Sequence, residues 1–129
     1  GPDFLHAVQH RRVAEHRRRA ARLQGEGHRA EAEAELTEAL ALLPGNAETL
    51  TALGFLRLQA GRLPEATGSL EAARAADPAY PPAVWGLALA AERSGDARAA
   101  RAHYEAYLRL SPRTYEAWQA RLALRRLPP

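Results

Sequence analysis

The sequence contains no cysteine, no methionine, no lysine and no isoleucine. Without cysteine there are no disulfide bonds and no thiolate metal sites, and the redox compartment stays open. No apolar run approaches membrane-spanning length and no signal segment is evident, which slightly favours a cytoplasmic location. Ala and Leu, both strong helix formers, supply most of the 47% hydrophobic residues. The abundance of Ala and Leu and the absence of Ile predict an all-α protein. The chain has the length of a single domain.

The missing residue types also bear on origin. All 18 basic residues are Arg, and Ala, Leu and Pro are abundant. This bias indicates a GC-rich bacterial genome. The lack of Met and the opening Gly1-Pro2 indicate a segment trimmed by a protease from a longer protein.

Several residue types recur along the chain at a spacing of 34 residues. The recurring sets are Gly27, Gly61 and Gly95; Pro44, Pro78 and Pro112; Ala32, Ala66 and Ala100; and Ala39, Ala73 and Tyr107. A period of 34 is typical of helix–turn–helix units stacked into a solenoid.

The predicted fold is a right-handed α-solenoid with three repeats, 13–46, 47–80 and 81–114. The repeat domain is predicted to span residues 13–127 and to end in a capping helix over 115–127. Residues 1–12, including the trimmed end, are predicted to form an N-terminal helical extension. We expect Asp3 to cap a helix that runs from Phe4 to about Gln24.

Within each repeat, glycine and proline mark where helices turn and stop. Gly61 supplies the backbone conformation needed between two helices, and Pro64 suits the first turn of the next. Small residues at one repeat position (Ala20, Gly54, Ala88) allow close helix approach beside larger ones (Leu36, Leu70, Tyr104). Trp118 and Leu122 are expected to cover the last apolar face.

The chain resembles the tetratricopeptide repeat (TPR) family. Repeat two carries Leu50, Leu53, Gly54, Ala66, Leu70, Ala73 and Pro78 at the family's consensus positions, and repeat three carries Val84, Leu87, Ala88, Ala100, Tyr104, Tyr107 and Pro112. Three departures stand out. His16 and Arg19 replace apolar residues in repeat one, and Arg57 replaces an aromatic residue in repeat two.

The resemblance implies a concave groove lined by the first helix of each repeat. Carried over position by position, the groove residues are Arg17, Thr51, Phe55, Leu58, Trp85, Leu89 and Glu92, with Ala14, Ala21, Gln24, Glu48 and Pro82 at the remaining positions. Phe55, Leu58, Trp85 and Leu89 are large apolar groups that the core pattern does not require. They indicate a groove for an apolar or amphipathic helix or peptide, with Trp85 as anchor. Packing against the N-terminal helix, or another helix of the parent protein, is the alternative.

TPR domains that grip a C-terminal carboxylate use basic and Asn residues at fixed groove positions. Those positions here hold Arg17 and Ala21, then Ala52, then Pro82 and Gly86. Since only Arg17 can serve, the sequence disfavours binding of that type.

The N-terminal quarter of the chain is strongly basic. Residues 1–24 carry six Arg and two acids, whereas residues 25–46 carry one Arg and five Glu. One interpretation is an electrostatic patch for nucleic acid or an acidic surface, involving Arg11, Arg12, Arg18 and Arg22. The favoured interpretation is pairing with Glu31, Glu33, Glu35 and Glu38 on the neighbouring helix. The six Arg of this segment are called the Arg run below: Arg11, Arg12, Arg17, Arg18, Arg19 and Arg22. No aromatic residue lies between them, which disfavours nucleic acid as a partner.

No pattern indicates catalysis, a cofactor or a metal site. His6 and His10 stand four residues apart, but no third ligand is near them in the sequence. No serine has an evident base, and the carboxylates are expected on solvated faces. We therefore expect a non-catalytic scaffold that binds a protein or peptide. Self-assembly through Phe4, Leu5 and Val8 and the terminal helices is a further alternative.

Overall fold

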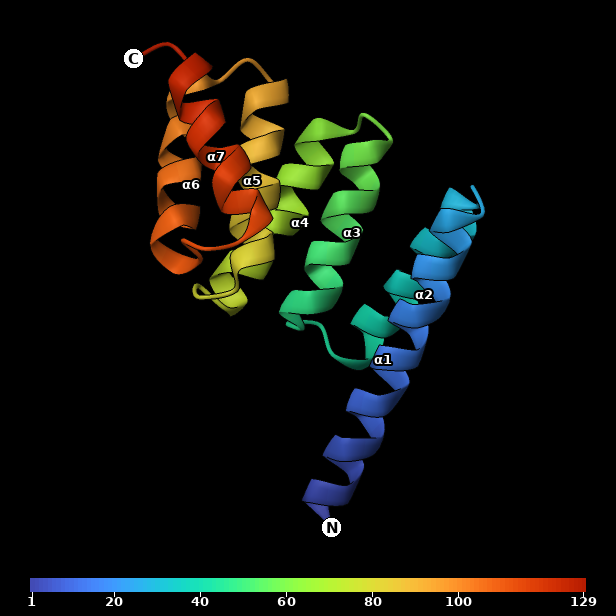
Figure 1. The fold of residues 1–129 in the computed structure, drawn as a ribbon. Coiled ribbons are helices and arrows are strands. Elements are labelled where there is room, and N and C mark those ends of the chain that lie inside the picture. Colours follow the sequence, from blue (N-terminus) through green and yellow to red (C-terminus); the bar gives the residue numbers. More distant parts are fainter.

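The computed structural model describes all of residues 1–129 and consists of seven helices. Their bounds are α1 Pro2–Gly25, α2 Arg29–Leu42, α3 Ala47–Gln59, α4 Leu63–Ala76, α5 Pro81–Arg93, α6 Ala97–Leu110 and α7 Tyr115–Arg126. Successive antiparallel pairs stack side by side into a solenoid, with α7 at the end of the stack (Figure 1). The predicted all-α solenoid fold is confirmed. None of the helices has both the length and the apolar character needed to cross a membrane.

The first helix of each repeat ends in the same hydrogen-bonded turn. Gly27, Gly61 and Gly95 have φ of 86°, 77° and 79°, the left-handed region that glycine enters without steric cost. The residue after each glycine donates its N–H across the turn, as Arg62 does to the Arg57 carbonyl at 2.9 Å. This pattern satisfies carbonyls that the helix end would otherwise leave unpaired. The 34-residue glycine period is thus a backbone requirement.

The N-terminal helix begins earlier than the sequence predicts. Pro2 is already helical, Gly1 is the N-cap, and Asp3 lies in the first turn without capping it. The expectation that Asp3 caps the helix is therefore wrong. A proline with its fixed φ suits the first helical position, and an acid in the first turn favours the positive helix end.

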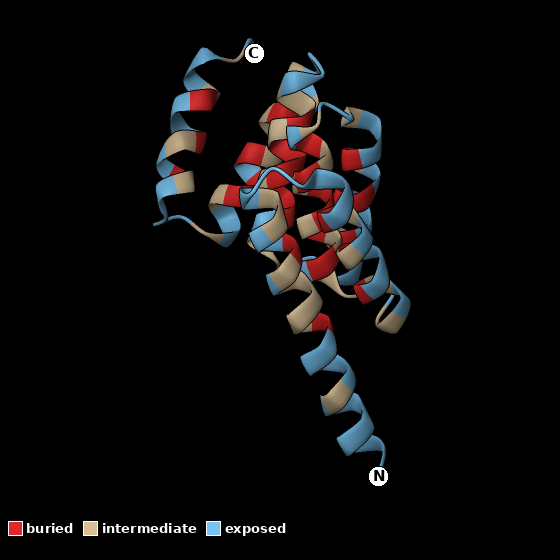
Figure 2. Ribbon diagram, turned by 90° about the vertical axis from the view of Figure 1, so that its right-hand side faces the viewer, coloured by how far each residue is buried: buried red, intermediate tan, exposed pale blue.

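The first part of α1 projects from the body of the solenoid. Figures 1 and 2 show this end extending past the other helices, and Phe4 and Leu5 on it are exposed. Val13 is the first residue along α1 that is buried. The division of the chain at residue 12 stays a prediction.

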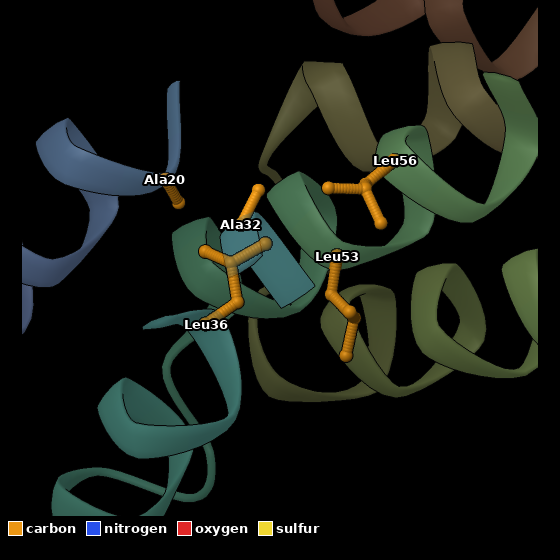
Figure 3. Close-up of a cluster of buried hydrophobic side chains, with 5 residues drawn as sticks. All are labelled: Ala20, Ala32, Leu36, Leu53 and Leu56. Atoms are coloured by element: carbon orange, nitrogen blue, oxygen red, sulfur yellow. The ribbon is translucent and has the colours of Figure 1, made fainter. Parts of the chain in front are cut away.

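The core runs between the helices as a series of small clusters. One cluster joins the first three helices through Ala20, Ala32, Leu36, Leu53 and Leu56 (Figure 3). Ala20 and Ala32 let α1 and α2 approach closely, and Leu53 and Leu56 of α3 close the same cluster from the next repeat. Each repeat therefore buries its apolar face partly against its neighbour, as a stacked array requires.

The contact between α3 and α4 depends on the missing side chain of Gly54. A Cβ built there would lie 2.5 Å from Leu70 Cγ and 2.7 Å from Leu70 Cδ2. Leu70 is fully buried, so it has little room to move. The predicted role of this small residue in close helix approach is confirmed.

The last helix is attached differently from the sequence-based expectation. Ala117, Ala120 and Ala123 are buried against the preceding repeat, whereas Trp118 and Leu122 are 54% and 39% exposed. The expectation that Trp118 and Leu122 cover the last face is therefore wrong. Three alanines at three-residue steps already form a complete contact face, which turns the larger side chains outward.

A polar network also ties α7 to the third repeat. Glu92 accepts from the Tyr104 hydroxyl at 2.6 Å and pairs with Arg126 Nη2 at 2.7 Å. Partial burial alone would raise the pKa of Glu92, but the bonds from Tyr104 and Arg126 outweigh it and lower the pKa. Burial, followed by the bond to Glu92, raises the pKa of Tyr104. Arg101 Nη2 adds bonds to the Leu124 and Leu127 carbonyls at 3.0 and 2.9 Å.

We predict that Gly54→Ala destabilises the protein although alanine is the better helix former. Overpacking against Leu70 costs about 1–3 kcal/mol, which outweighs a propensity gain of up to about 1 kcal/mol. Gly68→Ala is the matched control, because a Cβ on this exposed helical glycine meets nothing within 4 Å. It is expected to gain about 0.5–1 kcal/mol. Urea unfolding measures both, and a stabilised Gly54→Ala protein would contradict the packing described.

We predict that Glu92→Gln makes stability less dependent on acid pH. Because the pKa of Glu92 is lowered in the folded state, its stabilisation is full above the unfolded pKa and is lost as the pH falls through the folded pKa. Wild type therefore loses more stability than Glu92→Gln on acidification from neutral pH to about pH 3. Glu105→Gln, at an exposed carboxylate without an ion pair, is the control. Equal acid sensitivity of all three proteins in urea titrations would contradict this role.

Candidate binding groove

The first helices of the repeats form one layer of the solenoid. Helix α1 contacts α3, and α3 in turn contacts α5. Residues of α5 and α7 line a common hollow, so α7 continues this layer. The groove that the sequence predicts would lie along these helices.

Trp85 on α5 is fixed by two tyrosines of α6. Its ring lies 5.6 Å from that of Tyr104 and 5.4 Å from that of Tyr107, measured between centroids, in edge-on and tilted arrangements. Such pairs contribute about 0.5–1.5 kcal/mol beyond the area they bury. Trp85 remains half-buried, so part of a rigid indole faces outward.

Two hollows lie on either side of Trp85, and together they are called the aromatic crevice below. The first, of about 380 Å³, has Leu89, Trp118 and Leu122 among its walls. The second, of about 510 Å³, has Phe55 and Pro82 among its walls. The other lining residues are Tyr104, Gln119 and Arg126 in the first, and Pro81, Tyr107, Ser111, Thr114 and Glu116 in the second.

The structure separates the uncharged residues of the predicted groove into two groups. Phe55, Trp85 and Leu89 line the aromatic crevice. Thr51 and Leu58 are only 4% and 3% exposed, so their expected exposure in the groove is wrong. Leu58 packs with Ala66 and Ala90 between repeats two and three, and the buried Thr51 hydroxyl has no hydrogen-bond partner.

The two charged residues of the predicted groove are engaged within the protein. Arg17 forms an ion pair with Glu48 at 2.8 Å, and Glu92 is paired with Arg126. Of the other positions considered for carboxylate binding, Ala21 is exposed, whereas Gly86 is buried. The structure brings no free basic group to these positions.

The sequence analysis missed the contribution of α7 to the groove. Trp118 and Leu122 line the crevice, and the 66% exposed Tyr115 lies against Trp118 in a tilted arrangement with ring centroids 5.7 Å apart. The signal was present in the sequence. The Ala117, Ala120 and Ala123 spacing already supplies the packing face of this helix.

The Arg run pairs with α2 at only one point. Arg19 Nε lies 3.3 Å from Glu35, and His16 Nδ1 lies 2.6 Å from the same carboxylate. The hydrogen bond with His16, reinforced by Arg19, lowers the pKa of Glu35. Glu33 instead pairs with Arg57 and Arg62 of repeat two, at 3.3 and 3.0 Å.

The expected pairing of the N-terminal arginines with the α2 glutamates is therefore confirmed for Arg19 with Glu35. It is wrong for the other three glutamates, because Glu33 pairs with repeat two, and Glu31 and Glu38 lie near histidines instead. Arg57 reaches across to Glu33 and also donates to the Ser69 hydroxyl at 2.7 Å, where the family places an aromatic residue. Arg22 pairs with Glu26 on its own helix at 3.6 Å. Arg11, Arg12 and Arg18 are exposed and form no ion pair.

His16, Glu35 and Glu38 bring three potential metal-ligand atoms, one imidazole nitrogen and two carboxylate oxygens, within 4.8 Å of one another. Arg19 lies 3.0 Å from His16 Nδ1 and also bonds Glu35. Its fixed positive charge opposes a cation at this place, so we interpret the group as an ion-pair network that joins α1 to α2. His6 and His10, the spaced pair of the sequence analysis, pack edge to face with centroids 4.2 Å apart.

Three solved structures similar to this one are described as TPR domains. The Arabidopsis OM64 TPR domain has 20% identity and a TM-score of 0.83, covering 91% of this chain and 97% of that one. The second TPR domain of human RPAP3, solved in complex with an HSP70 peptide, has 20% identity and a TM-score of 0.81 over 92% and 98% of the two chains. The Sgt2 TPR domain of Aspergillus fumigatus has 20% identity and a TM-score of 0.83 over 88% and 77%.

At these identities the likeness concerns the fold. No curated protein matches the chain in a sequence search. A family model described as tetratricopeptide repeat matches residues 23–88, which is half of the chain. Together with the 34-residue period, the glycine turns and the stacked helix pairs, this match shows that the chain belongs to the tetratricopeptide repeat family.

Proposed function

We infer that this chain is a non-catalytic scaffold that binds a segment of another protein in its concave groove, at the aromatic crevice. The observation that carries this function is the outward-facing indole of Trp85 between two hollows. Rigid aromatic side chains in partly enclosed apolar sites are the usual anchors of protein interfaces. The second RPAP3 domain, which has a similar fold, is solved with a bound peptide, which supports peptide binding as a use of this fold.

The chemistry of the groove favours an apolar ligand over an acidic tail. Arg17 is the one basic residue at the positions considered for carboxylate binding, and Glu48 already neutralises it. Trp85, Leu89 and Phe55 offer apolar surface instead. Burying such surface contributes about 25 cal/mol per Å² before the costs of association.

We predict that Leu89→Glu weakens ligand binding at least about tenfold, a loss of about 1.4 kcal/mol. A charge placed in the half-buried crevice opposes any apolar ligand. Random peptides displayed on phage are selected on the immobilised chain, and their affinities for wild type and variant are measured by tryptophan fluorescence. Leu110→Glu, the same change at an exposed site outside the crevice, is the control and is expected to bind as wild type does. Peptides that bind both variants equally would contradict the groove as the site.

A second candidate function is an adaptor for nucleic acid or an acidic surface. The observation that favours it is the exposure of Arg11, Arg12 and Arg18 without any ion pair. This function predicts binding of labelled DNA or RNA that falls steeply with salt. The binding would be lost when all three residues are changed to Gln. No change in anisotropy at about 50 mM salt would remove this function.

A further inference from the structure

We propose that the aromatic crevice binds an amphipathic α-helix of a partner protein, which presents two apolar side chains seven residues apart, and that Trp118 and Leu122 of α7 form half of its docking surface. This inference rests on the proposed function and narrows it to one kind of partner. It also assigns a binding role to α7, the helix that the sequence presents as a cap.

The first support is the composition of the surface. Leu89 and Trp85 on α5 face Trp118 and Leu122 on α7 across one hollow. Trp118 is 54% exposed and Leu122 39% exposed, and neither is needed to attach α7, which packs through its alanines. Contiguous exposed apolar groups on two neighbouring helices mark an interaction site.

The second support is the spacing of the two hollows. Pro82 lines one hollow and Leu89 the other, with Trp85 between them. Seven residues of helix span about 10 Å at 1.5 Å per residue. A ligand helix lying along α5 and α7 therefore places side chains i and i+7 into the two hollows. Those positions share one face of a helix.

The third support is the state of the polar side chains along the groove. Among the residues that line the crevice, Tyr104 donates its hydroxyl to Glu92 at 2.6 Å, and the hydroxyls of Tyr107 and Thr114 are bonded to each other at 2.9 Å. Gln119 donates to the Tyr115 hydroxyl. An extended peptide needs partners for its own N–H and C=O groups, and few are free here. A helix pairs its own N–H and C=O groups internally, so it can bind through apolar side-chain contacts alone.

The fourth support is charge. The charged residues that line the crevice are Arg126 and Glu116. Arg126 is neutralised by Glu92, whereas Glu116 forms no ion pair. An uncharged helix face therefore complements the crevice. The N-terminal end of that helix, or a basic residue near it, would complement Glu116.

The experiment compares two yeast-displayed peptide libraries on the complete chain. Both use peptides of about 18 residues, five turns of helix. In the first, apolar residues vary at i, i+3, i+4 and i+7 of a helix-forming sequence. In the second, the same positions vary, but Pro and Gly prevent helix formation. Enrichment from the helical library alone is the expected result, and equal or better enrichment from the non-helical library would overturn the proposal.

Variants of α7 test whether that helix is part of the site. For the selected peptides, Trp118→Ala and Leu122→Gln are each expected to weaken binding at least about tenfold. Phe4→Ala, which removes a still more exposed aromatic group from the projecting end of α1, is the control and leaves affinity unchanged.

The outcomes separate this inference from the broader function. Non-helical peptides whose binding depends on Leu89 and not on Trp118 would overturn the inference and leave the groove function standing. If neither library nor the random peptides yielded a binder, the result would count against this inference and against the groove function. Self-association that sedimentation detects and Trp118→Ala abolishes would make a second copy of the chain the occupant, which also overturns the inference.

Discussion

The close approach of the two helices within each repeat is the constraint on which the rest of the structure depends. Where α3 crosses α4, a glycine faces Leu70 so closely that even a methyl group would collide with it. Ala20 and Ala88 hold the equivalent position in the other repeats and are almost completely buried. Because protein interiors are packed as densely as crystals, such close contacts leave the two helices of a pair little freedom to shift. The stack of pairs, in turn, arranges the first helices in one layer.

That arrangement leaves the outward side of the first helices free for other uses. The core consumes one side of α5, and the tyrosines of α6 support Trp85 from behind. A side chain held in this way loses little entropy when a ligand contacts it. The same tyrosine that supports Trp85, Tyr104, also bonds Glu92 and through it Arg126. Attachment of α7 and rigidity of the crevice therefore have a common basis.

In the first two repeats, the polar residues that replace the family's apolar ones have polar partners on neighbouring helices. His16 and Arg19 share Glu35, and Arg57 bonds Glu33 and Ser69. Each departure from the apolar pattern of the family thus has a partner on the opposing helix. Such partly exposed ion pairs add little stability, typically 0–1 kcal/mol, but an unpaired member would be costly. They favour one register between α1, α2 and α3 over others.

The sequence by itself determined the repeat architecture. Every 34 residues a glycine allows a turn, a proline ends a helix, and a small residue allows close helix approach, and each of these effects is local and steric. It also identified Phe55, Trp85 and Leu89 as large apolar side chains beyond the core pattern, but it placed Leu58 in the same set. Only the tertiary structure decided that Leu58 and Thr51 are buried, because their exposure depends on how closely the next repeat stacks. It likewise decided that Glu33 pairs with repeat two. The outward orientation of Trp118 follows from the same cause, since the helix packs on whichever face fits most closely, and three alanines fit more closely than an indole.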